Sequence, residues 1–158
     1  MKRVKLDKID KKILNDLQND GRITNVELAD RAGISAPPCL RRVRALEEAG
    51  FIVGYHAHLD AAKLGYGVTI FVQVGLESQA ENDLKKFEKR VSEWPNVREC
   101  HMLVGEADFL LKIVAEDWDE YQNFLTHDLT SAPNVSSVKS FLTVRQSKYQ
   151  PGVPIDIE

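Results

Sequence analysis

The spacing of apolar residues changes once along the chain, and this change restricts the fold more than any other feature. In the N-terminal part, apolar side chains such as Ile9, Ile13 and Leu17 recur every three or four residues, which is the period of an amphipathic helix. From Val68 onward, in the run VTIFVQVGL, apolar residues alternate with others, as in a strand with one buried face. We therefore predict a helical N-terminal part and a C-terminal part built around strands.

Three helices are predicted in the N-terminal part, and the second and third are separated by a very short turn. Asp7 and Thr24 are suitable N-cap residues for the first two helices, because their side-chain oxygens accept hydrogen bonds from free backbone N–H groups. Glu27 follows Thr24 at the third helical position, which is the pattern of a capping box. Gly33 is predicted to end the second helix, and Ser35 to cap the third.

The third predicted helix contains two prolines and three arginines. Pro37 and Pro38 fall in its first turn, where backbone N–H groups have no partner inside the helix, so the missing donors cost little. Its apolar residues predict one buried stripe, formed by Cys39, Leu40, Val43 and Leu46. Arg41 is then expected on the opposite side of the helix, with Arg42 and Arg44 flanking it.

Two helices joined by a short glycine-containing turn, the second of them basic, are typical of a DNA-binding helix-turn-helix. Arginine provides a bidentate fork for guanine in the major groove or a charge for phosphates. The candidate DNA-contacting residues are Asn25, Ser35, Pro37, Pro38, Arg41, Arg42 and Arg44. The alternative is that the arginines are only a solvated helix face, and the sequence does not separate a base-reading arginine from one that contacts phosphate.

The net charge of −3 is unevenly distributed along the chain. Residues 1–60 carry 11 Lys and Arg against 9 Asp and Glu, a net charge of +2. Residues 61–158 carry 10 against 15, a net charge of −5. This asymmetry favours contact between a polyanion and the N-terminal part alone. A cytoplasmic location is expected, because the sequence shows neither an apolar run that would span a bilayer nor a signal peptide.

The C-terminal part predicts a ferredoxin-like βαββαβ sandwich, so the expected fold class is α+β. The predicted elements are a strand at 68–76, a helix at 80–94, strands at 97–104 and 109–115, a helix at 117–129 and a strand at 135–146. The predicted domains are a helix-turn-helix at 1–50, a strand or hinge at 51–65, the sandwich at 66–148, and a tail at 149–158. The tail is expected to be poorly ordered unless it docks on a partner.

The sequence contains little that suggests catalysis or metal binding. Cys39 and Cys100 stand in no CxxC or Cys/His spacing, so both are interpreted as buried small hydrophobic residues. His56 and His58 alternate, but two imidazoles rarely make a metal site. We find no nucleophile–base motif and no phosphate-binding loop. We therefore expect no enzyme activity, no cofactor and no metal.

Two stretches carry a family resemblance, which runs from about Leu6 to Lys148. LDKIDKKILNDLQNDGRITNVELADRAGISAPPCLRRVRALEEAGFIVGY resembles the N-terminal domain of the Lrp/AsnC (feast/famine) transcriptional regulators, and ECHMLVGEADFLLKI resembles the central motif of their effector domain. The resemblance implies a regulator whose assembly or DNA affinity responds to a small molecule, commonly an amino acid. It also implies dimers that assemble further, often to octamers, that exchange the segment FIVGYHAHLD and bind a pseudo-palindromic DNA site.

The resemblance further implies an effector site at interfaces between the C-terminal domains. The matching positions are Met102, Leu103, Gly105, Asp108, Trp118, Phe141, Leu142 and Thr143. Asp108 would either face an α-ammonium group or hold its loop. The alternative is that these residues are ordinary core or interface packing. The alternative function is a nucleoid-type, DNA-organising member of the same family that has no small effector.

Overall fold

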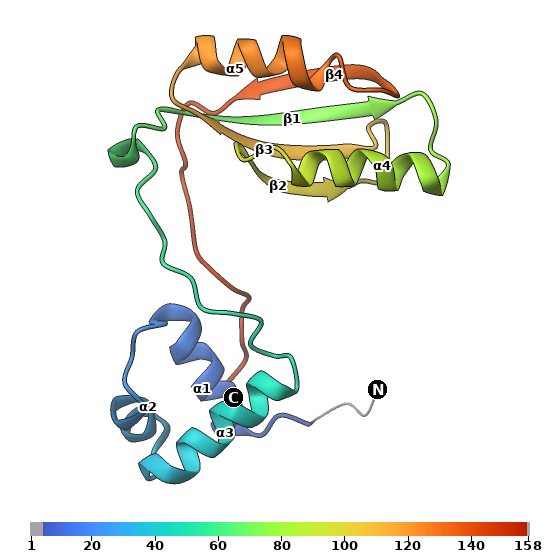
Figure 1. The fold of residues 1–158 in the computed structure, drawn as a ribbon. Coiled ribbons are helices and arrows are strands. Elements are labelled where there is room, and N and C mark those ends of the chain that lie inside the picture. The colour runs from blue at the N-terminus through green and yellow to red at the C-terminus, as the bar shows by residue number, and fades with distance from the viewer. Residues whose placement is uncertain (1–4, 158) are drawn as a thin grey trace. The chain divides into compact units, whose positions relative to one another are not determined.

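The structure is a computed structural model that describes residues 5–157, and the chain folds into two compact units (Figure 1). The first unit comprises the residues up to His58 together with those from Lys148 onward, and the second is Leu59–Ser147. The first unit is helical, and the second is a four-stranded antiparallel sheet with helices. The predicted α+β fold class is therefore confirmed.

The first unit consists of α1 (Lys8–Asn19), α2 (Asn25–Ala32) and α3 (Ala36–Glu48). The three helices share one apolar core, formed by Ile13, Leu28, Ala29, Ala32, Cys39 and Leu46. Ala29 and Ala32 are small enough for α2 to approach its neighbours closely. The core is compact, and its members come from all three helices.

The local signals at the helix ends act as predicted. Asp7 and Thr24 are the N-caps of α1 and α2, and each forms a complete capping box with the third residue of its helix. Gly33 ends α2 with a φ of +75°, a left-handed conformation that glycine adopts without steric cost. Pro37 and Pro38 lie in the first turn of α3, where their missing N–H groups break no helical hydrogen bond.

The predicted stripe on α3 needs one correction. Cys39 is completely buried and Leu46 is 3% exposed, but Leu40 is 39% exposed. The buried side of α3 is therefore centred on Cys39 and Leu46, which lie seven residues and two turns apart. The larger side chain of Leu40 had suggested the wrong centre, because apolar spacing alone does not say which of two adjacent residues faces the core.

The second unit has the predicted ferredoxin-like order of elements. They are β1 (Val68–Leu76), α4 (Glu81–Ser92), β2 (Val97–Met102), β3 (Phe109–Ala115), α5 (Trp118–Phe124), a π-helical turn (Leu125–Leu129) and β4 (Val135–Leu142). A 3-10 turn, Ala62–Leu64, precedes β1. The sheet order is β2-β3-β1-β4, and every neighbouring pair is antiparallel (Figure 1). The last strand ends four residues before its predicted end at residue 146.

Both helices of the second unit cover the same face of the sheet. Residues that alternate along β1 and β3 form one buried cluster with α4 and α5, namely Ile70, Val72, Val74, Phe109, Leu111, Ile113, Phe87, Val91, Tyr121 and Phe124. The intervening residues, such as Phe71 and Leu110, point to the other face, because successive side chains on a strand alternate. No helix of the unit packs on that open face among the described residues.

The two cysteines differ from the prediction in one case. Cys39 is buried in the first unit, as expected, whereas Cys100 is exposed. Cys100 lies on β2, an edge strand of the sheet, so one side of it has no neighbouring strand. No helix in the described part of the chain combines the length and the apolar character that crossing a bilayer requires.

The two segments that flank the sandwich have no regular secondary structure beyond the short turn before β1. Residues 51–60, for which the sequence leaves strand or hinge open, contain no strand in the structure. The tail lies against the first unit. The Gln18 side chain donates to the Val153 carbonyl oxygen at 2.9 Å and accepts from the Val153 N–H at 3.1 Å. The rings of Tyr149 and His58 are stacked, with centroids 4.4 Å apart.

Gly152 provides a direct test of this docking. Its φ is +76°, and a Cβ at this position would lie 2.1 Å from Gln18 Oε1. We expect Gly152→Ala to release the tail, since a left-handed L-residue costs roughly 1–2 kcal/mol and Gln18 must also move. Hydrogen exchange of the Val153 amide should accelerate, whereas the exposed control Gln150→Ala should leave it slow. Unchanged exchange in Gly152→Ala would contradict this docked conformation.

Candidate DNA-binding surface and effector site

The side chain of Asn25, a predicted DNA contact, holds the turn between α2 and α3. Asn25 Nδ2 donates to the Ala36 carbonyl oxygen at 2.9 Å and so joins the start of α2 to the first turn of α3. The other amide atom, Asn25 Oδ1, is buried and has no hydrogen-bond partner among residues 5–157. Ser35 is the N-cap of α3 by position, but its hydroxyl makes no capping hydrogen bond. Ser35 and Pro37 are exposed, and Pro38 is half-buried.

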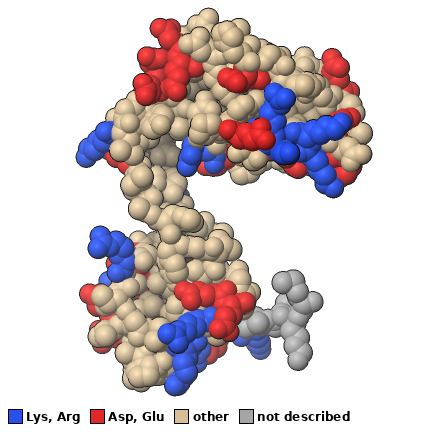
Figure 2. Space-filling view, viewed as in Figure 1, with Lys and Arg blue, Asp and Glu red and all other residues tan. Residues whose placement is uncertain are grey.

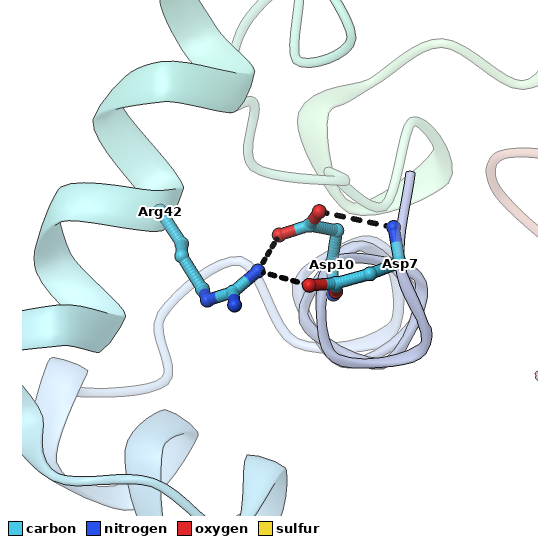
Figure 3. Close-up of polar contacts among 3 residues, drawn as sticks. All are labelled: Asp7, Asp10 and Arg42. Atoms are coloured by element: carbon cyan, nitrogen blue, oxygen red, sulfur yellow. Dashed lines mark hydrogen bonds and ion pairs between the residues drawn. The ribbon is translucent and has the colours of Figure 1, made fainter. Parts of the chain in front are cut away.

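The three arginines of α3 have different surroundings. Arg41 and Arg44 are exposed, and neither forms an ion pair with any residue in the described range. Arg42 is half-buried and is ion-paired twice (Figure 3). Arg41 and Arg44 can therefore meet a phosphate or a base with the whole guanidinium group, whereas Nη1 of Arg42 is already held by two carboxylates.

The partners of Arg42 are the two carboxylates at the start of α1. Arg42 Nη1 lies 2.7 Å from Asp7 Oδ2 and 2.6 Å from Asp10 Oδ1. The same two residues form the capping box of α1, and Figure 3 shows one of its two hydrogen bonds, from the Asp7 N–H to the Asp10 carboxylate. Hydrogen bonding from the Asp10 N–H, followed by that from the Arg42 guanidinium, lowers the pKa of Asp7 below its ordinary value. The Asp7 carboxylate therefore stays ionised at neutral pH and keeps its attraction for Arg42.

On the face that Figure 2 shows, the positive charge of the first unit is interrupted by negative charge. In Figure 2, the Lys and Arg side chains at the lower end of this unit lie beside Asp and Glu side chains on the visible face. A net charge of +2 over residues 1–60 is also small. The DNA affinity of this unit then depends on the positions of single cations, and α3 presents two, Arg41 and Arg44, that form no ion pair with a described residue.

The first group of predicted effector positions lies at the β2–β3 connection. Met102 ends β2 and is 54% exposed, and it lines a surface hollow of about 340 Å³ with Cys100 and Phe109. Gly105 has a φ of +154°, a conformation that L-residues rarely adopt. The connection therefore turns at a position where a larger residue would be strained.

Asp108 holds this connection against the neighbouring strand β1. Its Oδ2 accepts a hydrogen bond from the Leu76 N–H at 2.6 Å and a longer one from Gln79 Nε2 at 3.4 Å. Its backbone N–H donates to the Val74 carbonyl oxygen at 2.9 Å, and its own carbonyl oxygen accepts from the Leu103 N–H at 2.8 Å. Of the two roles left open by the sequence, this geometry favours holding the loop.

The second group lies where α5 begins and β4 ends. Trp118 is the first residue of α5 and is 49% exposed, with its ring 5.4 Å from that of the buried Tyr121. The Tyr121 hydroxyl is hydrogen-bonded to the Ser140 hydroxyl on β4. Phe141 and Leu142 are each 51% exposed, and they point to opposite faces of the sheet because they are adjacent on a strand. The Thr143 N–H donates to the Thr69 carbonyl oxygen at 3.0 Å.

The two groups stand at opposite corners of the sheet. Met102, on edge strand β2, pairs with Phe109 on β3. Leu142, on edge strand β4, pairs with Ile70 on β1. Strands β3 and β1 lie between them, and Ile70 and Phe109 are at opposite ends of the β1–β3 ladder. With strands about 4.8 Å apart and a rise of about 3.3 Å per residue, the groups are roughly 20 Å apart. One chain does not bring both groups around the same small molecule.

Several residues of these sites escaped the sequence analysis. Tyr121 and Ser140 tie α5 to β4 beneath the second group, and Leu76 and Gln79 hold Asp108. Each partner is distant in sequence from the residue it contacts, and no motif marks the pair. Ser140 and Leu142 lie on the same face of β4, opposite the buried Val72 and Ile70, but strand alternation does not identify the helix residue that contacts Ser140.

These features define a DNA-binding protein of two parts. One is a helix-turn-helix unit whose helix α3 carries two arginines that form no ion pair with a described residue, and the other is a ferredoxin-like unit. The chain belongs to the Lrp/AsnC family of transcriptional regulators. Residues 6–53 match the model of a winged helix-turn-helix DNA-binding domain, and residues 69–153 match that of the Lrp/AsnC ligand binding domain. The family consists of DNA-binding regulators rather than enzymes.

Relatives and solved structures agree with this assignment. The chain is 58% identical over 146 residues to the leucine-responsive regulatory protein of Rhizobium meliloti (strain 1021), covering 92% of this chain and 94% of that protein. It is 41% identical to the Bkd operon transcriptional regulator of Pseudomonas aeruginosa, covering 95% and 98%. A transcriptional regulator from Neisseria meningitidis, solved as its L-Met complex, superposes with a TM-score of 0.92 at 36% identity, covering 96% and 98%.

Proposed function

We propose that this regulator binds an amino acid with an apolar side chain at an interface between copies of its second unit, and that binding changes its assembly or its affinity for DNA. DNA binding is assigned to residues 1–50, and effector binding and assembly to residues 66–148. The observation that carries the proposal is the roughly 20 Å between the two groups of effector positions, which makes a site within one chain incomplete.

The chemistry of the two groups suits an amino acid. Met102, Trp118 and Leu142 offer exposed apolar surface for a side chain. The turn at Gly105 lets backbone N–H groups approach a carboxylate closely. A methionine complex of a 36% identical regulator and a leucine-responsive relative make L-methionine and L-leucine the first ligands to test.

A second copy also suits the open face of the sheet. Phe71 pairs with Phe141 across β1 and β4, and both lie on the face that no helix of the described residues covers. Phe141 is 51% exposed, a large apolar side chain that a partner sheet would bury. We therefore propose a dimer that assembles further, with an octamer as the expected end state, and that binds a pseudo-palindromic operator with half-sites about one helical turn or a multiple apart.

The test combines assembly and DNA binding. Light scattering of the full chain is measured with L-leucine, L-methionine, their D-enantiomers as controls, and no ligand; operator affinity is measured under the same conditions. We expect an L-amino acid, but not its enantiomer, to change the molar mass or the affinity. If a full panel of amino acids changes neither, the alternative of a DNA-organising protein without a small effector is correct.

A further inference from the structure

Arg42 and the backbone at the start of α1 together engage all four oxygens of the two carboxylates. Asp7 Oδ1 accepts from the Asp10 N–H, and Asp10 Oδ2 accepts from the Asp7 N–H. The remaining oxygens, Asp7 Oδ2 and Asp10 Oδ1, both accept from the same nitrogen, Arg42 Nη1 (Figure 3). All four carboxylate oxygens and the Nη1 nitrogen are therefore engaged within the group, so an outside partner would reach the Arg42 guanidinium through Nε or Nη2.

This network has an electrostatic reason. Two carboxylates held beside each other repel, although the N-terminus of α1 attracts both through its free N–H groups. Arg42 stands between them and offsets the repulsion. The Asp10 side chain is 16% exposed and that of Arg42 33%, so water screens this group less than a fully exposed pair.

The network also joins two helices that are far apart in sequence. Arg42 belongs to α3, and its partners lie 32 and 35 residues earlier, at the start of α1. The apolar core holds α1 and α3 together at Ile13 and Cys39, but apolar contact is non-directional. A polar contact with fixed geometry, placed away from that core, restricts the rotation of α3 about its own axis.

We propose that Arg42 is a positioning residue, which holds α3 so that Arg41 and Arg44 face the DNA, and that Arg42 does not contact the DNA itself. The proposal rests on the proposed contact between α3 and DNA. It reassigns one of the three arginines that the sequence places on the DNA-binding side. The residues that set the angle of α3 are then Asp7 and Asp10, two acidic side chains in a unit that binds a polyanion.

Charge and positioning predict opposite effects for one substitution. Asp10→Asn removes a negative charge from the DNA-binding unit, so electrostatics alone should strengthen DNA binding. If Asp10 positions α3 through Arg42, the same change should weaken specific binding, by up to about fivefold for the loss of one such ion pair. Asp30→Asn is the matched control, because Asp30 is exposed on α2 and has no ion pair in the described part of the chain.

The experiment measures operator affinity of the full chain at several salt concentrations, with thermal melts of each variant. We expect Asp30→Asn to bind slightly more tightly and Asp10→Asn more weakly. Arg42→Ala should bind more weakly with an unchanged salt slope, whereas Arg41→Ala should lose about one unit of slope if it contacts phosphate. If Asp10→Asn or Arg42→Ala unfolds below the assay temperature, Asp7→Asn is measured in its place, because it removes the ion pair between Arg42 and Asp7.

Two outcomes would overturn the proposal. One is that Asp10→Asn strengthens binding as much as Asp30→Asn does. The other is that Arg42→Ala lowers the salt slope by about one unit, as the loss of a phosphate contact would. The proposed function fails separately, when variants of Arg41 and Arg44 bind the operator as the unsubstituted protein does.

Discussion

Replacing both Arg41 and Arg44 by alanine is expected to weaken operator binding by about 2–6 kcal/mol, because each base or phosphate contact of this kind is worth about 1–3 kcal/mol. Both side chains are exposed on α3, and neither is ion-paired with another described residue, so the free protein already presents them to solvent. The substitutions leave the core of the first unit intact, so its melting temperature should hardly change. Fluorescence anisotropy with labelled operator DNA measures the loss.

The matched control removes the same charge from another helix. Lys11→Ala/Lys12→Ala takes two cations from α1 and should reduce binding to operator and to scrambled DNA alike. The single variants Arg41→Ala and Arg44→Ala then distinguish base reading from phosphate contact. Removal of a base-reading arginine should lower affinity for the operator only. Removal of a phosphate-contacting arginine should lower affinity for both DNAs and reduce the salt slope. If the variant that lacks both Arg41 and Arg44 binds both DNAs as tightly as the unsubstituted protein does, α3 is not the DNA-binding helix.

Removing the Asp108 carboxylate is expected to abolish the response to the effector. In Asp108→Ala the N–H of the buried Leu76 loses its acceptor, which costs roughly 1–3 kcal/mol in the stability of the second unit. The connection after Met102 should then open, since Asp108 joins it to β1. Thermal unfolding reports the stability, and calorimetric titration with L-leucine and L-methionine reports ligand binding.

The amide variant decides between the two roles of Asp108. Asp108→Asn keeps an oxygen that can accept from Leu76 but loses the charge that an α-ammonium group would need. Because the loop stays held, we expect this variant to bind ligand within about threefold of the unsubstituted protein. If Asp108 bound the ammonium group, the lost hydrogen bond to a charged group would instead cost roughly 1.5–3 kcal/mol, which is more than tenfold in affinity. A loss of that size would show that Asp108 faces the ammonium group. Glu106→Ala, in the same connection and exposed, should change nothing.

Features that depend on local interactions were predictable from the amino-acid sequence. The N-caps Asp7 and Thr24 contact residues only three positions away, and Gly33 and Pro37 act through their own backbone conformations. The alternation along β1 depends only on the geometry of a strand. These signals, with the order of elements, were enough for the α+β class, the helix-turn-helix and the ferredoxin-like sandwich.

Contacts between side chains that are distant in sequence became visible only in the folded chain. Arg41, Arg42 and Arg44 are chemically equal in the sequence, but only Arg42 finds carboxylates 32 and 35 residues away, because packing brings the start of α1 to α3. The effector positions match one family motif set, yet the sheet order puts them at opposite corners. Local periodicity places a residue on one face of its own element, whereas its partners depend on how distant elements pack together, and this decided the surroundings of both sites.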